Sequence, residues 1–111
     1  MVKFERLDRT FAALSDPKRR EILARLTGGP ATVSELAEPF AMSLPGLMKH
    51  VRVLESAELV TTEKRGRTRE CRLGPARLED AIAWIDMYRR DWERRFDRLE
   101  QVLERRRGDA T

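Results

Sequence analysis

The 111-residue sequence predicts a mainly α-helical domain of the α+β class, with about five helices and one β-hairpin. Apolar residues recur at spacings of three and four over residues 3–56 and again over 78–106, which predicts helices. Residues 59–64 and 67–73 alternate in polarity instead, which predicts two strands. Arg65-Gly66 lies between them, and glycine tolerates the positive φ of a hairpin tip. The length suits one domain over residues 1–111.

The first two helices are delimited by local signals. Residues 3–14 predict an amphipathic helix. Asp16 can accept hydrogen bonds from the amides of the following turn, and Pro17 suits the first helical position, so we expect a second helix to begin there. Its end is predicted at Gly28-Gly29-Pro30. The apolar faces of these two helices are Phe4, Leu7, Phe11 and Leu14, and then Ile22, Leu23 and Leu26.

A third and a fourth helix are predicted about three residues apart, which is the spacing of a helix-turn-helix. Thr32 or Ser34 begins the short third helix, with Val33, Leu36 and Phe40 facing inward, and Ala41-Met42 connects it to the fourth. Ser43 caps the fourth helix, and its apolar stripe is expected to be Leu44, Leu47, Val51 and Leu54. In such a motif the second helix enters the major groove of DNA and the first crosses the backbone.

The opposite face of the fourth helix carries cations. If Leu47, Val51 and Leu54 face the core, Lys49 and Arg52 point outward, where they can reach bases or phosphates. The alternative is that both side chains are merely solvated. His50 lies near the edge of the buried face, as a packing or phosphate-contacting residue and not a catalyst. The predicted DNA contacts of this helix are Ser43, Leu44, Pro45, Gly46, Lys49, His50 and Arg52.

The predicted hairpin is the second basic element. Residues 64–72 hold five cations against one acid, Glu70. Cations at a hairpin tip can straddle phosphates or enter the minor groove, so we expect double-stranded DNA as the partner. The alternative is an edge strand that its charges protect from aggregation. The predicted DNA contacts of the hairpin are Lys64, Arg65, Arg67 and Arg69.

The last helix, within residues 76–106, carries an apolar stripe: Ile85, Tyr88, Trp92, Phe96, Leu99 and Leu103. One small domain offers few partners to so long a stripe, so we predict a homodimer in which the stripes of two copies pair. Two reading helices would then lie about 34 Å apart, one turn of B-DNA. The alternatives are an intramolecular core, or a pocket for a small-molecule effector lined by Trp84, Tyr88, Trp92 and Phe96.

Composition narrows the function class. The net charge of +4 and the pI near 9.8 permit a polyanionic partner. Cys71 is the single cysteine, which excludes an internal disulfide and, with no signal-peptide pattern or membrane span, predicts the cytoplasm. Cys71 is expected to face inward as a packed residue, although nearby arginines leave a redox role open. One histidine and one cysteine offer no catalytic or metal constellation, so we predict no enzyme, metal site or cofactor.

Four segments together resemble the ArsR family of bacterial winged-helix regulators over residues 5–105: Asp16–Leu23, Thr32–Ala37, Met42–Glu55, and Arg65–Arg69 with Arg72-Leu73. The resemblance implies a winged helix-turn-helix that is dimeric through its terminal helices, so that Phe4, Leu7 and Phe11 of the first helix join the stripe of the last helix at the interface. It also implies a near-palindromic operator and, usually, a repressor released by a signal. A helical protein-interaction module without specific DNA binding is the alternative.

Some residues of this sequence differ from the family's pattern, and they concern the signal that the regulator would respond to and the operator that it would bind. The cysteine pair of the metal-sensing members would fall at Ala37 and Pro39, and the ligands of their last helix have no full counterpart here. The resemblance therefore implies a metal-independent branch. Met48 stands where the family usually has serine, and Gly46 where alanine or serine is more common. Both replacements lie in the predicted reading helix.

Overall fold

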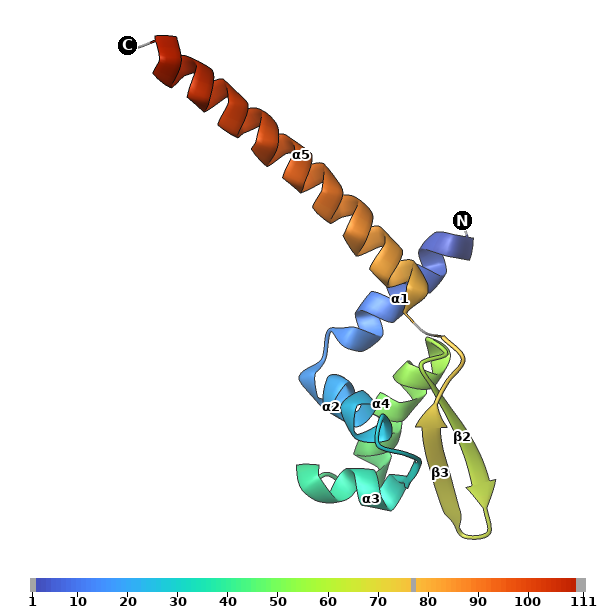
Figure 1. Ribbon diagram of the computed structural model, residues 1–111. Helices are drawn as coiled ribbons and strands as arrows, with labels where there is room; N and C mark the ends of the chain where they lie inside the picture. Colours follow the sequence, from blue (N-terminus) through green and yellow to red (C-terminus); the bar gives the residue numbers. More distant parts are fainter. Residues whose placement is uncertain (1, 77, 110–111) are drawn as a thin grey trace. The chain divides into compact units, whose positions relative to one another are not determined.

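The computed structural model describes the backbone of residues 2–76 and 78–109 and the side chains of residues 5–76 and 78–108. The chain divides into two compact units, Met1–Glu79 and Asp80–Thr111. The first unit contains helices α1 (Val2–Leu14), α2 (Pro17–Leu26), α3 (Val33–Ala37) and α4 (Leu44–Ser56), together with a small sheet. Its hairpin extends along one side of the helices (Figure 1).

The starts of the helices follow the predicted caps. One carboxylate oxygen of Asp16 accepts from the amides of Lys18 at 2.8 Å and Arg19 at 3.4 Å, so α2 begins at Pro17. At α3, Thr32 and Glu35 form a capping box, which decides the open choice in favour of Thr32. These are the local signals that the sequence predicted.

The predicted third helix, which was expected to include Phe40, is divided into two short helices before the turn. α3 ends at Ala37, and the chain continues as a short 3₁₀ helix, η1 (Glu38–Phe40). Pro39 lacks the amide hydrogen that another α-helical turn needs. Ala41 then adopts a left-handed conformation with a φ of 50°, which reverses the chain toward α4. The amide of Gly46 donates to the hydroxyl of Ser43 at 3.2 Å, as a cap does.

The sheet has three strands, not two, in the order β1-β3-β2 and antiparallel throughout. The additional strand, β1 (Ala31–Thr32), pairs with the second hairpin strand at Cys71 and Glu70. The hairpin consists of β2 (Val60–Arg65) and β3 (Thr68–Leu73).

The hairpin tip lies one residue later than predicted. Arg65 pairs with Thr68, so Gly66 and Arg67 form the turn, and the prediction of Arg65-Gly66 at the tip is wrong by one position. A two-residue hairpin loop favours positive φ at its first central position, and Gly66 supplies it with a φ of 61°.

The core of the first unit is continuous from the helices to the sheet. Its most deeply buried large side chains are Ile22, Leu36, Leu47, Val51, Leu54, Val60 and Cys71. Phe40 packs against this core from a partly buried position. Leu44 was expected in the apolar stripe of α4, but it is 48% exposed, because it is the first residue of the helix and lies at the edge of the core.

The described residues of the second unit all belong to one helix, α5 (Glu79–Asp109), drawn in orange and red in Figure 1. Its large apolar side chains are 42% to 60% exposed. Four aromatic rings follow one another along it: Trp84 stacks on Tyr88 at 5.4 Å, Tyr88 meets Trp92 edge-on at 6.3 Å, and Trp92 stacks on Phe96 at 5.3 Å. Among the described residues, no helix is both long and apolar enough to cross a membrane.

Candidate nucleic-acid interface

Helix α4 buries one face completely and exposes the other. The side chains of Leu47, Val51 and Leu54 are all 0% exposed. On the opposite side Lys49 and Arg52 are exposed. The orientation predicted from the helical spacing is therefore confirmed, and it directs both cations toward solvent.

The first turn of α4 is shaped by packing beneath it. A Cβ at Gly46 would lie 3.1 Å from the hydroxyl oxygen of Ser43 and 3.2 Å from Cγ of Met42, which is tight. A larger residue here would therefore require the side chain of Ser43 or Met42 to shift by a few tenths of an ångström. Pro45 has no amide hydrogen and the amide of Gly46 is taken by Ser43, so this turn has little to donate to a phosphate. Side chains, not main-chain amides, must therefore supply most of the positive charge.

Met48 does not belong to the outward face. It is partly buried and packs against the core of the first unit. The replacement of the family's usual serine by Met48 therefore affects the packing of α4 on the core more than its contacts with DNA bases.

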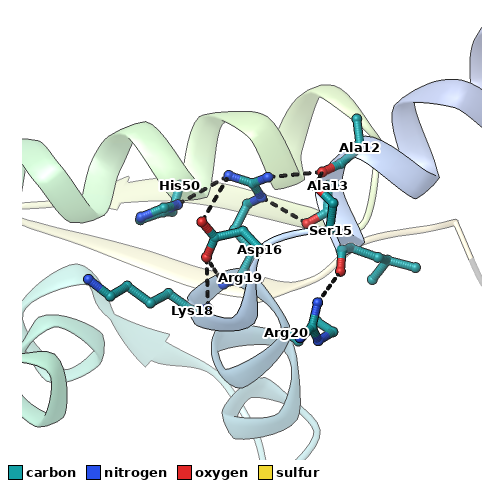
Figure 2. A network of polar contacts seen from close by, with 9 residues as sticks. Ala12, Ala13, Ser15, Asp16, Lys18, Arg19, Arg20 and His50 are labelled. Atoms are coloured by element: carbon teal, nitrogen blue, oxygen red, sulfur yellow. Dashed lines mark hydrogen bonds and ion pairs between the residues drawn. The ribbon is translucent and has the colours of Figure 1, made fainter.

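His50 takes part in a polar network that joins three helices (Figure 2). Nε of Arg19 donates to the carbonyl oxygen of Ala13 at 2.8 Å, and Nη2 donates to that of Ala12 at 2.9 Å. Nη1 of Arg19 lies 3.3 Å from Nδ1 of His50. Sequence reasoning missed Arg19, because its partners lie on α1 and α4 and no spacing within α2 points to them.

Asp16 completes this network. Its second carboxylate oxygen lies 4.0 Å from Nη1 of Arg19. Desolvation acts to raise the pKa of Asp16, but the amides of Lys18 and Arg19 and the nearby charges of His50 and Arg19 outweigh it, so the pKa lies below its ordinary value. Asp16 is therefore a carboxylate at neutral pH, as a helix cap and an ion-pair partner require.

Several arginines of the hairpin, the wing of the fold, have partners within it. Arg65 lies 3.4 Å from Glu63 and 3.9 Å from Glu70, and Arg72 bonds Glu70 as well. The hydrogen bond from Arg72, together with the charges of Arg65 and Arg72, outweighs desolvation and lowers the pKa of Glu70. These pairs are exposed, so each contributes little to stability, but they neutralise part of the charge of the wing.

Arg69 links the wing to α4. Its Nη1 donates to the hydroxyl of Thr62 at 2.9 Å, and that hydroxyl donates to Glu55 at 2.8 Å. Arg69 was predicted to contact DNA. Here its guanidinium joins β3 to β2 through Thr62, whose hydroxyl in turn joins β2 to the end of α4, and the sequence did not reveal this role.

Four of the predicted site cations have no ion-pair or hydrogen-bond partner for their side chains among residues 5–76 and 78–108. They are Lys49 and Arg52 on α4, and Lys64 and Arg67 on the wing. The start of α4, the adjoining α3 and the tip of the wing lie at the same end of the first unit (Figure 1). The first unit therefore presents unneutralised positive charge from two elements, α4 and the wing.

Cys71 lies on the inner side of the wing. It is 0% exposed, which confirms that it faces inward. Burial, helped by the negative charge of Glu55, raises the pKa of its thiol to about 11, and the opposing effect of Arg69 is too small to reverse this. A protonated, buried thiol is a packing residue, so the structure disfavours the redox alternative.

The residues predicted for dimerisation fall on both units. Leu7 and Phe11 are partly buried on α1, while the side chain of Phe4 lies outside the described residues. On α5 the stripe of Ile85, Tyr88, Trp92, Phe96, Leu99 and Leu103 is exposed. In the part of the chain that the structure describes, no three His, Cys, Asp or Glu residues are grouped as a metal site would need.

The chain resembles known DNA-binding regulators over most of its length. A model of the helix-turn-helix domain matches residues 14–63. The transcriptional repressor SdpR of Bacillus subtilis is 35% identical over 79 residues, which cover 71% of this chain and 88% of SdpR. The HTH-type transcriptional regulator Rv2034 of Mycobacterium tuberculosis is 35% identical over 104 residues, 94% of each chain.

Solved structures agree with these relatives. An ArsR family transcriptional regulator has 46% identity and a TM-score of 0.75, covering 80% of this chain and 92% of its own. An ArsR-like regulator from Rhodococcus sp. RHA1 has 32% identity and a TM-score of 0.76, covering 91% and 93%. The homodimeric winged helix-turn-helix domain Mb0332 of Mycobacterium bovis shares the fold at 22% identity and a TM-score of 0.62, covering 79% and 81%. The chain belongs to the ArsR family of winged helix-turn-helix transcriptional regulators.

Proposed function

We propose that the protein is a repressor that binds a specific DNA operator as a homodimer. One observation carries the proposal: α4 buries Leu47, Val51 and Leu54 completely while Lys49 and Arg52 extend into solvent without a partner among the described residues. A helix that is packed on the core along one face and carries cations on the other is suited to entering a groove. SdpR, which is similar over most of this chain, is named a transcriptional repressor.

In this proposal α4 lies in the major groove. Lys49 and Arg52 then donate to base edges such as N7 and O6 of guanine, or to the phosphates that border the groove. The exposed Leu44 and Pro45 in the first turn are placed for apolar contact with a thymine methyl group. Ser43, Gly46 and His50 complete the contact surface of the helix.

The wing contacts the backbone beside that groove. Lys64 and Arg67, which have no partner within the described part of the chain, reach phosphates or the adjacent minor groove. Arg65 and Arg69 have partners within the protein, so in this proposal they contact DNA only after exchanging those partners. The wing thus contributes affinity for DNA that depends little on the base sequence of the DNA.

Two copies bind together, through α1 and the exposed stripe of α5. The support is the row of half-exposed apolar side chains along α5 and the homodimeric state of Mb0332, which shares the fold. A twofold dimer matches a palindromic operator, since each half-site then meets one α4. We place this dimer in the cytoplasm, without a metal or cofactor; a small-molecule effector between the subunits is compatible with it.

The test is binding to the DNA upstream of the gene that encodes the protein, measured by fluorescence anisotropy against scrambled DNA. The double variant Lys49→Ala with Arg52→Ala is expected to lose about thirtyfold or more in specific affinity, because each lost base contact costs about 1–3 kcal/mol. Arg90→Ala with Arg94→Ala removes the same charge from the α5 face opposite the stripe and serves as the control. Equal losses in both variants, or a stable dimer that does not prefer this DNA, would favour the protein-interaction module.

A further inference from the structure

Among the described residues of the first unit, Arg19 has more side-chain hydrogen-bond and ion-pair partners than any other cation, and it is not among the residues expected to touch DNA. Its side chain is only 15% exposed, whereas the cations of the DNA face are open to solvent. It starts on α2, caps the end of α1 through the carbonyl oxygens of Ala12 and Ala13, and reaches His50 on α4. Figure 2 shows these contacts converging on one guanidinium group.

The contact with His50 favours one of the two possible positions for the hydrogen of the neutral ring. A guanidinium group has only donors, so Nη1 of Arg19 donates and Nδ1 of His50 accepts, at 3.3 Å. A neutral imidazole with Nδ1 as acceptor carries its hydrogen on Nε2. In Figure 2 the other ring nitrogen lies on the side of the ring away from Arg19, and the residue is only partly buried. Nε2 is therefore a donor on the flank of α4.

We propose that Arg19 is a positioning residue of the DNA interface, which holds His50 in the Nε2–H form so that this hydrogen is donated to a DNA phosphate oxygen. The inference rests on the proposed function and extends it to a residue that does not itself touch DNA. His50 follows Lys49 in α4, so the two side chains flank the same stretch of the helix.

Arginine suits this position better than lysine. The planar fork of the guanidinium group serves two carbonyl oxygens of α1 and the His50 ring at the same time. A lysine ammonium keeps the charge but cannot span these three partners in a fixed geometry. Arg19→Lys therefore separates the charge of residue 19 from its positioning role.

The tautomer can be measured without DNA. His50 is the only histidine of the chain, so an untagged protein labelled with 15N-histidine gives one set of ring signals. At a pH where the ring is neutral, the native protein is expected to show hydrogen on Nε2 alone, and Arg19→Lys to show exchange between both tautomers. Hydrogen on Nδ1 in the native protein overturns the proposal, whatever the variants do.

DNA affinity provides the second readout, in a double-mutant cycle. His50→Ala and Arg19→Lys are each expected to weaken binding about fivefold to tenfold, the effect of one hydrogen bond, and the double variant to lose little more. His50→Gln places an amide donor near the position of Nε2, so it is expected to bind within about threefold of the native protein. Thermal unfolding identifies any variant that has lost its fold.

The outcomes separate this inference from the proposed function. If the native protein binds its upstream DNA, and Lys49→Ala with Arg52→Ala abolishes this binding while His50→Ala does not change it, the role of Arg19 is refuted and the repressor proposal stands. Additive losses from Arg19→Lys and His50→Ala also refute it. If the native protein does not bind DNA specifically, the proposed function itself is refuted.

Discussion

Gly74 shows how one residue fixes the base of the wing. A Cβ at this position would lie 2.4 Å from the carbonyl oxygen of Glu58, which no side-chain motion can relieve. The amide of Gly74 donates to Leu59 at 2.9 Å, and that of Ala76 donates to Glu58 at 3.1 Å. Gly74→Ala must therefore displace backbone, and it is expected to lower the free energy of unfolding by about 1–3 kcal/mol in urea titrations at constant protein concentration.

Gly28 provides the control for that substitution. A Cβ there would meet the carbonyl oxygen of Arg25 at 3.5 Å, an ordinary van der Waals contact. Gly28→Ala is expected to change the free energy of unfolding by no more than about 0.5 kcal/mol. Similar destabilisation by both variants would show that loss of glycine, and not the close approach to Glu58, determines the effect.

Cys71 leads to a prediction about reactivity. With a pKa of about 11 and no exposed surface, its thiol is almost fully protonated and shielded at pH 8. A disulfide reagent such as DTNB is expected to react with the native protein at least about a hundredfold more slowly than with the urea-unfolded chain. DNA binding is likewise expected to withstand mild peroxide. Rapid modification of the folded protein would restore the redox role that the sequence left open.

At the level of elements, the sequence predicted what local chemistry determines. Asp16, Thr32 and Ser43 cap α2, α3 and α4, because a cap needs only the amides of the next turn. The two residues of β1 escaped prediction, because a strand this short has no period and its partner, Cys71, lies far along the chain. The hairpin tip was misplaced by one residue because strand register depends on pairing.

The residues of the candidate site also fall into two groups, those whose role could be predicted from the sequence and those whose role could not. The outward direction of Lys49 and Arg52 follows from helical spacing and was predictable. The roles of Arg19 and Arg69 were not, because each acts on residues of other elements: Arg19 on His50, and Arg69 on Thr62. Long arginine side chains reach neighbours that no sequence pattern specifies.

The wing, as an element, is expected to supply affinity without specificity. The double variant Lys64→Ala with Arg67→Ala removes the two cations of the wing that have no partner among the described residues. The slope of log affinity against log salt should then fall by about two, with equal losses for operator and scrambled DNA, because phosphate contacts release counterions whatever the sequence. Binding titrations at several salt concentrations measure this.

Arg65→Ala with Arg72→Ala is the matched comparison for the wing. It removes the same charge, but from side chains that are paired with Glu63 and Glu70. A clearly smaller change in the salt slope is expected. A loss confined to operator DNA in the first variant would mean that the wing reads bases, and equal slopes in both would mean that pairing within the wing does not matter.

For the whole molecule, the decisive feature is the stripe of α5. From Ile85 to Leu103 its members recur every three or four residues over 18 positions, which is five turns of a regular helix, so they stay on one face. The stripe contains three of the four aromatic rings that follow one another along the helix. A face this apolar and this exposed indicates a partner, and a second copy of the chain supplies an identical one.

Trp92 lies in the middle of that stripe and is 47% exposed. Trp92→Glu puts a carboxylate where a dimer would exclude water, so it is expected to sediment as a monomer at micromolar concentration. Its affinity for operator DNA should then fall about a hundredfold or more, because the second half-site no longer benefits from the first. Gln101→Glu, nine residues later on the opposite face of α5, adds the same charge and should remain dimeric with full affinity. A Trp92→Glu protein that stays dimeric would exclude this stripe as the interface, and a monomer that binds as tightly as the native protein would show that one α4 and one wing suffice.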